Sequence, residues 1–255
     1  FIGSSFLKGN DVISMAKLRS SYGVNGNGDI GNYTWRPLFG YGINYNQTPG
    51  GAFNNIGNID LTWELNKPFN VGFDLGFFRD RLTVTADYYS RTTSDLLLNR
   101  QISRTTGFNS ILQNVGEMRN RGYEFSIGGF PIDNGNFKWS TNFNITFNKN
   151  EVTKLPGGSD ILDGAFILRE GHDYRTYYVR EYAGVDPQTG DPMWYTDGTK
   201  TKTTKTYSQA QRTLVGSASP KFFGGFNNSF SYKGFTLDAL INYNFGNLVR
   251  DGWEF

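Results

Sequence analysis

The stretch that decides the fold class runs FKWSTNFNITFN from Phe137 to Asn148. Its odd positions carry Phe, Trp, Thr, Phe, Ile and Phe, whereas its even positions carry Lys, Ser, Asn, Asn, Thr and Asn. Successive side chains of a β-strand point to opposite faces of the sheet. A period of two sustained over this length therefore predicts a long strand with one apolar and one polar face.

Six further segments of the chain follow the same alternation. It is clear in residues 69–77, 82–89 and 235–245, and less regular in residues 16–24, 121–130 and 222–232. The sequence therefore predicts an all-β, antiparallel fold with about seven long strands and almost no helix.

Alternation alone does not separate a membrane barrel from a soluble β-sandwich, because a sandwich also buries one face and hydrates the other. Strand length separates them. Several strands here reach about ten to twelve residues, the length that crosses a bilayer when tilted, against about five or six in ordinary sheets. The polar face is mainly Asn, Ser, Thr and Gly, as in the wet interior of a membrane barrel.

Short and long connections between the strands alternate strictly. The short ones are residues 78–81, 131–136 and 233–234, and the long ones are residues 25–68, 91–114 and 149–221. Outer-membrane barrels have this asymmetry between periplasmic turns and extracellular loops. Aromatic side chains gather at the short-turn ends, as an interfacial girdle requires; they are Phe77, Phe78, Phe130, Phe137, Tyr232 and Phe235. We predict an antiparallel transmembrane β-barrel, of which this chain is an incomplete segment.

The alternation also assigns each side chain to one face of the predicted barrel. The side chains expected to face lipid include Phe73, Val84, Phe143, Ile145, Leu237 and Ile241. Those expected to face the lumen include Asp74, Asp87, Asn142, Asn144 and Asp238. The charged lumen residues could contact a solute or a plug, or pair with one another across strands; they are Lys17, Arg19, Asp74, Asp87, Glu124, Lys138 and Asp238.

Composition argues against catalysis and nucleic-acid binding. The 255 residues contain no Cys and one His, His172, so thiolate metal sites, Cys nucleophiles and His-based triads or zinc sites have almost no residues to use. Lys plus Arg number 25 against 23 for Asp plus Glu, without a basic cluster, so nucleic acid is not an expected partner. We therefore expect that the protein is not an enzyme and that it has no catalytic residue, no cofactor and no metal site.

Two glycine-containing motifs have simpler explanations than ligand binding. Gly26, Gly28 and Gly31 spell G-x-G-x-x-G, but the residues that follow do not predict the helix that a dinucleotide phosphate needs, so a glycine-rich loop is expected. Residues 186–191, DPQTGD, place carboxylates around a Gly and could bind calcium. Pro followed by Gly is also ordinary turn chemistry, which favours a hairpin tip inside the longest loop.

Aromatic residues in the long connections are the candidate solute-contacting side chains. They could stack on sugar rings or peptide side chains, and packing within the loops is the alternative for each of them. The candidates are Trp35, Tyr41, Tyr45, Trp63, Trp194 and Tyr195.

Several segments are specific enough to indicate a family. Residues 17–31 begin KLRSSYG and continue through Gly26 and Asn27 to Ile30 and Gly31, which resembles a segment of SusC/RagA-type TonB-linked outer-membrane proteins. A second match is the N-x-G-x-x-x-N-x-G-x-E pattern of TonB-dependent receptor barrels, formed here by Asn114, Gly116, Asn120, Gly122 and Glu124. Further similar segments are DYY at 87–89 with DLL at 95–97, GVDPQTGDP at 184–192 and PKFFGG at 220–225.

The resemblance implies a barrel of about 22 strands with a plugged lumen. We therefore expect residues 1–255 to be part of the barrel domain, with the plug and the remaining strands outside this sequence. No Met and no signal peptide stand at Phe1, so the sequence is expected to be an internal piece of a longer protein. The family's energy-coupling residues would then lie elsewhere.

The resemblance also implies a function for the whole protein. It would import a glycan or a peptide across the outer membrane, with a SusD-like lipoprotein on its outer face and TonB acting through the plug. The alternative from a different class is a soluble or secreted all-β binding module that uses the loop aromatics.

Overall fold

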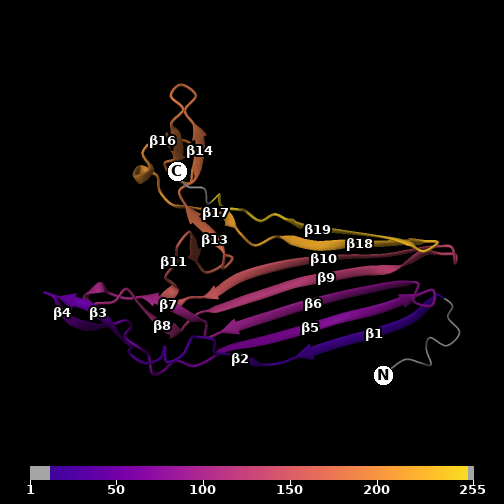
Figure 1. The fold of residues 1–255 in the computed structure, drawn as a ribbon, viewed down its shortest axis with the longest axis horizontal. Helices are drawn as coiled ribbons and strands as arrows, with labels where there is room; N and C mark the ends of the chain where they lie inside the picture. Colours follow the sequence, from indigo (N-terminus) through magenta and orange to yellow (C-terminus); the bar gives the residue numbers. More distant parts are fainter. Residues whose placement is uncertain (1–11, 252–255) are drawn as a thin grey trace.

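The computed structural model describes residues 12–251, and the expectation about the chain start at Phe1 lies outside them. Seven long strands form one antiparallel meander, in which each strand pairs with the next long strand of the chain (Figure 1). They are β1 (Ile13–Tyr22), β5 (Glu64–Phe77), β6 (Leu82–Ser94), β9 (Glu117–Asp133), β10 (Phe137–Lys154), β18 (Phe222–Tyr232) and β19 (Phe235–Phe245). The prediction of an all-β antiparallel fold with about seven long strands is confirmed.

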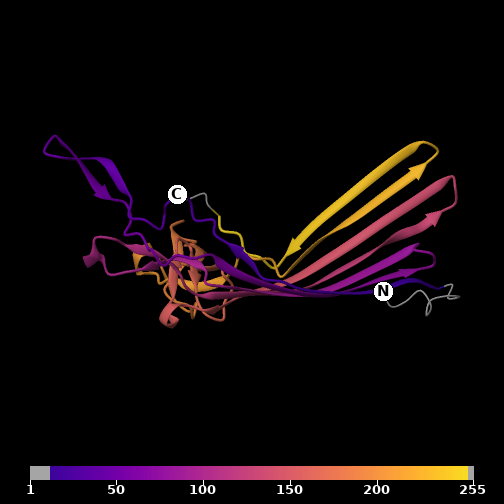
Figure 2. The same ribbon diagram turned by 90° about the horizontal axis from the view of Figure 1, so that it is seen from below.

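The sheet curves without closing on itself. Figure 2 shows the yellow strands β18 and β19 lifted well out of the plane of the indigo and purple strands. Within residues 12–251 the path of paired strands ends at β1 on one side and at β19 on the other. A short strand, β2 (Asn25–Asn27), pairs with the beginning of β5. This curved, open sheet has the form expected of part of a barrel wall.

The three short connections are present, the second being only residues 134–136 because β9 continues to Asp133, and their backbone shows how they reverse the chain. Lys233 and Gly234 have φ of 47° and 89° between β18 and β19, the left-handed pair that a two-residue hairpin turn requires. The β5–β6 turn has positive φ at Phe78, Arg79 and Asp80. Asp80 is held there because its carboxylate accepts from the Ser14 hydroxyl at 2.7 Å.

The register aligns the apolar residues of all seven strands on one face. Leu75 pairs with Val84, Val84 with Ile127, and Ile127 with Phe143. The row continues from Phe143 to Phe226 and Ile241. Paired residues point to the same side of a sheet, so the predicted division into two faces is confirmed. Lipid on one face and a lumen on the other remain a prediction.

The aromatic residues at the short-turn end form register rows, as expected for a girdle. Phe137 pairs with Tyr232, and Tyr232 pairs with Phe235. The next ring inward, Phe230, stacks on both Phe137 and Trp139, with centroid distances of 6.4 and 5.9 Å. Tyr232 and Phe235 are 50% and 81% exposed, so these two side chains can contact whatever surrounds the sheet.

Four strands, β5, β6, β9 and β10, run further toward the long loops than the alternation predicts, whereas β18 and β19 have the predicted bounds. β9 begins at Glu117 and β10 ends at Lys154, whereas residues 121–130 and 137–148 were the expected strands. In the extensions of β9 and β10 most side chains are polar on both faces and some pair with each other: the amide of Asn150 donates to Asn120, and Thr153 donates to Glu117. Hydrophobic periodicity cannot detect a strand whose two faces are both polar.

The first long connection is also shorter than predicted, because β5 begins at Glu64 and includes Pro68. A proline inside a strand lacks the N–H that would bond a neighbour. Here Pro68 lies opposite the interruption between β1 and β2, and its carbonyl accepts from the Gly23 N–H at 3.1 Å. The proline therefore occupies the point where one neighbouring strand is broken.

The long connections contain strands of their own, so they are structured insertions. The first holds the hairpin β3 (Phe39–Tyr45) and β4 (Thr48–Phe53), and the second holds β7 (Leu97–Gln101) and β8 (Ser110–Asn114). The third holds a four-stranded sheet of β11 (Ile161–Asp163), β12 (Phe166–Leu168), β13 (Thr176–Val179) and β17 (Thr213–Ser217). It also holds a three-stranded sheet of β14 (Tyr182–Val185), β15 (Pro192–Tyr195) and β16 (Thr203–Thr204).

Helix is limited to three short 3₁₀ turns among the described residues, η1 (Arg104–Thr106), η2 (Pro156–Gly158) and η3 (Tyr207–Gln209). None of the helices in residues 12–251 has the length and apolar character needed to cross a membrane.

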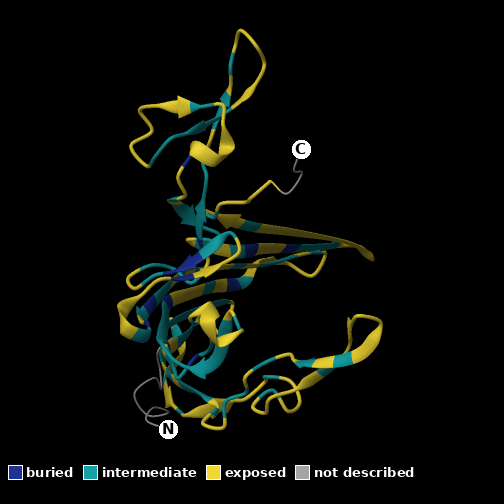
Figure 3. Cartoon of the chain, turned by 90° about the vertical axis from the view of Figure 1, so that its left-hand side faces the viewer, coloured by how far each residue is buried: buried dark blue, intermediate teal, exposed yellow. Residues whose placement is uncertain are grey.

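The fully buried hydrophobic side chains lie at the loop end of the molecule (Figure 3). Val152, Leu155, Ile161 and Leu168 form one cluster, which joins the end of β10 to β11 and β12. The apolar face of the long sheet, in contrast, is largely exposed or half-buried. The core therefore sits under the insertions and fixes them to the end of the sheet.

Candidate functional site

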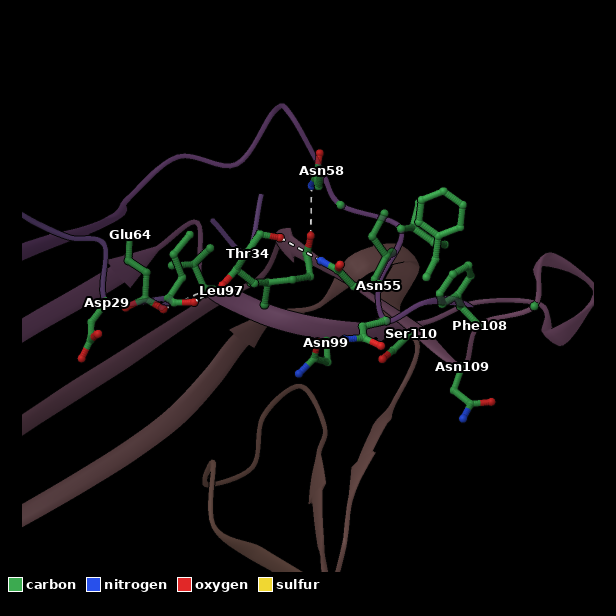
Figure 4. A pocket seen from close by; sticks show the side chains of 18 of the residues that line it. Asp29, Thr34, Asn55, Asn58, Glu64, Leu97, Asn99, Phe108, Asn109 and Ser110 are labelled. Carbon is green, nitrogen blue, oxygen red and sulfur yellow. Dashed lines mark hydrogen bonds between the residues drawn. The ribbon is translucent and has the colours of Figure 1, made fainter. Parts of the chain in front are cut away.

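A polar pocket lies between the first two insertions, at the loop end of the sheet (Figure 4). We call it the inter-loop pocket; its volume is about 840 Å³. Ten of its lining residues have amide, hydroxyl or carboxylate side chains, and seven are apolar, among them Ile30, Ile56 and Ile111. The side chains that line it include Asn27, Asp29, Thr34, Phe53, Asn54, Asn55, Asn58, Glu64, Leu97, Asn99, Phe108, Asn109, Ser110 and Leu112.

Two asparagines join the insertions that form the inter-loop pocket. The Asn58 amide donates to the Leu112 carbonyl at 3.0 Å, across from the first insertion to β8. Asn114, on β8, reaches from the second insertion to the first: its Oδ1 accepts from the Thr62 N–H at 2.8 Å, and its Nδ2 donates to the Thr62 carbonyl at 2.7 Å. A side-chain amide that bonds both backbone groups of one residue acts like a strand partner. The pocket walls are therefore fixed relative to each other.

Asn55 organises the wall that the first insertion contributes. Its Oδ1 accepts from the Leu38 N–H at 2.8 Å, and its Nδ2 donates to the carbonyls of Thr34 and Arg36 at 3.0 and 3.1 Å. Nearly all of its hydrogen-bonding capacity is used in holding the loop. Asn55 is therefore a structural residue of the pocket.

The inter-loop pocket has an acidic character, because two carboxylates and none of the described Lys or Arg side chains line it. Glu64 accepts from the Leu97 N–H at 2.9 Å and from the Asn27 amide at 3.1 Å. Asp29 also lines the pocket, whereas no Lys or Arg of the described residues 12–251 lines it. Such a site suits a polar ligand that is neutral or positively charged and disfavours an anion.

On the polar face of the long sheet, the predicted cross-strand pairing of charges is confirmed for four residues. The Arg19 guanidinium contacts Asp74 at 2.7 Å and Asp87 at 2.9 Å, so it bridges β1, β5 and β6. The Lys17 ammonium lies 4.0 Å from Asp74. Gly72 makes room for this contact, because a Cβ there would meet the Asp87 carboxylate at 1.9 Å. These charges bind each other across the strands.

The other predicted lumen charges lie elsewhere on the polar face. Glu124 pairs in register with Asp87, next to the Arg19 cluster. Lys138 is 3.9 Å from Asp133 at the short-turn end. Asp238 stands opposite Ser229. They extend the polar face along the sheet and do not form a single site.

Four of the six candidate aromatic residues belong to the first insertion. Tyr41 and Tyr45, on β3, are 88% and 86% exposed. Trp35 carries the Arg36 guanidinium 4.4 Å from its ring centroid. Trp63 packs over Gly26, where an added Cβ would lie 3.3 Å from the indole Cγ. Gly26 therefore makes room for Trp63, and Gly31 has a φ of 73°, so packing and backbone conformation account for these two glycines of the G-x-G-x-x-G motif.

The other two candidates, Trp194 and Tyr195, lie on β15 in the separate three-stranded sheet at the top of Figure 1. Trp194 is half-buried against Tyr207, whose ring centroid is 5.2 Å away. The Lys200 ammonium lies 5.9 Å from the Tyr195 ring. The structure therefore separates the six aromatics into two groups, β3 being at the far left of the same view. Solute contact by any of them stays a prediction.

Stretch 186–191 forms the predicted hairpin tip between β14 and β15. The Gly190 N–H donates to the Asp186 carbonyl at 2.8 Å, which closes the turn. The Lys205 ammonium contacts the carboxylates of Asp186 and Asp191 at 2.6 and 3.0 Å. This contact holds the pKa of Asp186 below its usual range, and the Thr189 hydroxyl, with Lys205, does the same for the pKa of Asp191. Lys205 therefore occupies both carboxylates and balances one of their two negative charges.

The polar residues of the inter-loop pocket were not identified from the sequence. A signal was available in the Asn-rich stretch AFNNIGN at residues 52–58. Asn in a loop is ordinary turn chemistry, so this stretch alone does not distinguish a pocket from a turn. What makes it a pocket is its contact with the second insertion, through Asn58 and Leu112.

Comparison with known proteins agrees with the predicted family. The model of the family described as TonB dependent receptor-like, beta-barrel matches residues 12–255. TonB-dependent receptor P39 of Formosa agariphila is 34% identical over 97% of this chain and 28% of its own length. TonB-dependent receptor SusC of Bacteroides thetaiotaomicron is 40% identical over 61% of this chain and 16% of its own length.

The fold is similar to that of a solved transporter. The structure of the RagAB peptide transporter matches with a TM-score of 0.79 and 34% identity, covering 92% of this chain and 27% of the other. The RagAB peptide importer in its open-open state matches with a TM-score of 0.80. The resemblance to SusC/RagA-type proteins is confirmed, and this chain belongs to the TonB-dependent receptor-like β-barrel family.

Proposed function

We propose that this chain is part of the barrel domain of an outer-membrane transporter that imports glycans or peptides. The observation that supports the proposal most is the continuous antiparallel pairing from β1 to β19, with its apolar and polar faces. An apolar face without a covering layer needs a nonpolar surrounding, and a lipid bilayer provides it. The family's TonB-dependent receptors share this barrel, and the soluble binding module accounts less well for the open face.

The chain spans 28% of the length of P39 and 27% of the matched RagAB chain. The plug, the remaining strands and the TonB contact therefore belong, in this proposal, to other parts of a longer protein. Closing the barrel is physically required, because an unpaired strand edge cannot face hydrocarbon. The open edges of β1 and β19 would pair with those further strands.

The inter-loop pocket supports a polar solute. Amide side chains offer donors and acceptors together, which suits the hydroxyls of a glycan and the backbone of a peptide equally. The carboxylates of Asp29 and Glu64 and the lack of a lining cation disfavour anionic solutes such as uronic-acid glycans or acidic peptides. A SusD-like lipoprotein would cover the insertions from outside, since they project beyond the strand ends (Figure 1).

Fractionation and uptake in the native cell test the proposal. The full-length protein should be found in the outer-membrane fraction, and its deletion should abolish uptake of a labelled neutral glycan or peptide. Complementation should restore that uptake, and a SusD-like lipoprotein should co-purify. Recovery of the full-length protein as a monodisperse monomer without detergent would contradict the proposal and support the soluble binding module.

Spin labels give an independent test of the membrane placement. Ile145 and Asn144 are neighbours in β10 and point to opposite faces. In the full-length protein a label at Ile145 should be accessible to a lipid-soluble relaxation agent, and one at Asn144 to a water-soluble agent. Equal accessibility of the two labels would contradict the two-face assignment.

A further inference from the structure

A second cavity lies on the apolar face near the short turns, far from the inter-loop pocket. We call it the Gly129 notch; its volume is about 600 Å³. Its rim includes the apolar side chains Ile127, Phe143 and Phe226, which form one register row. The next row toward the short turns consists of Leu82, Gly129 and Thr141, and it provides much less side-chain volume.

The notch is a consequence of the backbone. A β-bulge lies where Trp139 pairs with Ile132 and Thr141 pairs with Gly129. A Cβ at Gly129 would lie 2.1 Å from the Arg81 carbonyl oxygen, so a side chain cannot fill this position. Bulges redirect side chains and are specific features of a sheet. The apolar face of the sheet is therefore hollow at Gly129.

A positive charge borders the apolar hollow. Arg81 lines the notch, and its guanidinium donates to the Phe130 carbonyl at 3.3 Å. Among the described residues, 12–251, no carboxylate lies within the 4.0 Å of an ion pair from it.

We propose that the Gly129 notch binds one glycerophospholipid, with an acyl chain in the hollow and the phosphate on Arg81. This rests on the proposed function, in which the apolar face meets lipid. The exposed aromatic row of Tyr232 and Phe235 then marks the level of the lipid headgroups. A phosphate placed at that level would lie within reach of Arg81. Arginine side chains bind phosphate through two parallel hydrogen bonds. The volume lies within the roughly 300–1,000 Å³ of ordinary ligand sites.

Native mass spectrometry of the full-length protein, extracted from its membrane in mild detergent, tests this inference. Wild type should retain one phospholipid per chain. Arg81→Gln should lower the retained fraction about fivefold, the effect of one basic side chain near anionic lipid. Arg79→Gln is the matched control, because Arg79 belongs to the same turn without lining the notch, and it should retain the lipid.

A second variant acts on the hollow itself. Thr141 projects from the same row as Gly129, so Thr141→Trp should fill the notch and reduce retained phospholipid to the level of the bare micelle. Equal losses in the Arg79 and Arg81 variants, or lipid that persists in Thr141→Trp, would overturn the inference. So would a polypeptide, in place of lipid, captured by a photo-crosslinker at position 141.

The two proposals fail separately. Outer-membrane fractionation and heat-modified gel migration report insertion and folding of the same samples. Variants that keep both properties while wild type carries no phospholipid would overturn the lipid site alone. A full-length protein that is not in the outer membrane would overturn the proposed function as well.

Discussion

The long sheet and the insertions at its loop end are stabilised in different ways. On the sheet, large apolar side chains remain open, with Phe73, Leu237 and Ile241 at 53%, 65% and 58% exposed. At the loop end, Val152 and Ile167 are 0% and 1% exposed. The sheet has hydrogen-bonded strands and no core of its own, whereas the insertions have the small core of a soluble domain. The first region therefore depends on its surroundings and the second on its internal packing.

Substitution inside the loop-end core should have the largest effect. Ile167→Ala removes a side chain that is 1% exposed and should destabilise the β11–β12–β13–β17 sheet by about 2–5 kcal/mol, the usual cost of such a cavity. Hydrogen exchange of the full-length protein would show faster exchange in that sheet and an unchanged exchange rate in the long strands.

Leu162→Ala is the control for this prediction, because Leu162 pairs with Ile167 in the sheet yet is 50% exposed. It should change exchange much less. Faster exchange in β9 and β10 together with the insertion would show that the two regions unfold as one unit, and the comparison would then break down.

A charge on the apolar face should have the next largest effect. Ile145 lies near the middle of β10, and Ile145→Arg should destabilise the folded barrel by about 2–4 kcal/mol if this face meets the centre of a bilayer. Denaturant titration of the full-length protein in lipid vesicles measures it. Asn144→Arg, one residue away on the polar face, should cost far less. Similar costs at both positions would mean that the two faces meet similar surroundings.

The sequence predicts the sheet better than the insertions, for a physical reason. Residues 137–148 form one apolar and one polar face, and the alternation of side-chain types along the sequence reveals both. Beyond them polar side chains such as Asn150 and Thr153 stand on both faces, beside the buried Val152, and the strand continues without a periodic signal. The predicted loop-side ends of β5, β6, β9 and β10 were therefore wrong, while the bounds of β18 and β19 and the antiparallel arrangement were correct.

The candidate site shows the same limit. Aromatic type alone placed Trp35 and Trp194 in one group, yet they lie in different insertions. The inter-loop pocket depends on the bond from Asn58 to the Leu112 carbonyl, which joins residues 54 positions apart. Contacts between loops leave no local pattern, since each asparagine is equally suited to an ordinary turn.

Replacing three loop aromatics tests whether the insertions recognise the solute. Trp35, Tyr45 and Trp194 changed together to Ala should weaken uptake, because each stacking ring contributes roughly 0.5–1.5 kcal/mol beyond area burial. The amount of folded full-length protein in the outer membrane should be unchanged, because these side chains lie outside the long sheet. Unchanged uptake at equal expression would place recognition in the other strands, the plug or the lipoprotein.

The smallest predicted effect concerns an ion pair at the edge of the loop-end core. Arg169 binds Asp160 through Nε at 3.0 Å and Nη2 at 2.6 Å, and this contact lowers the pKa of Asp160. With side chains 35% and 38% exposed, the pair should contribute at most about 1 kcal/mol. A lowered carboxyl pKa means that this stabilisation is complete above the ordinary Asp pKa and is lost as the pH falls through the lowered value.

Asp160→Asn should therefore speed exchange in β11 and β12 slightly at about pH 7, and the difference from wild type should diminish as the pH falls through the lowered pKa of Asp160. Comparing both proteins at the same pH removes the intrinsic pH dependence of exchange. The long strands should not respond at either pH, since the pair lies wholly within the third insertion. A difference between variant and wild type that persists at low pH would show that Asp160 acts through packing or backbone contacts and not through its charge.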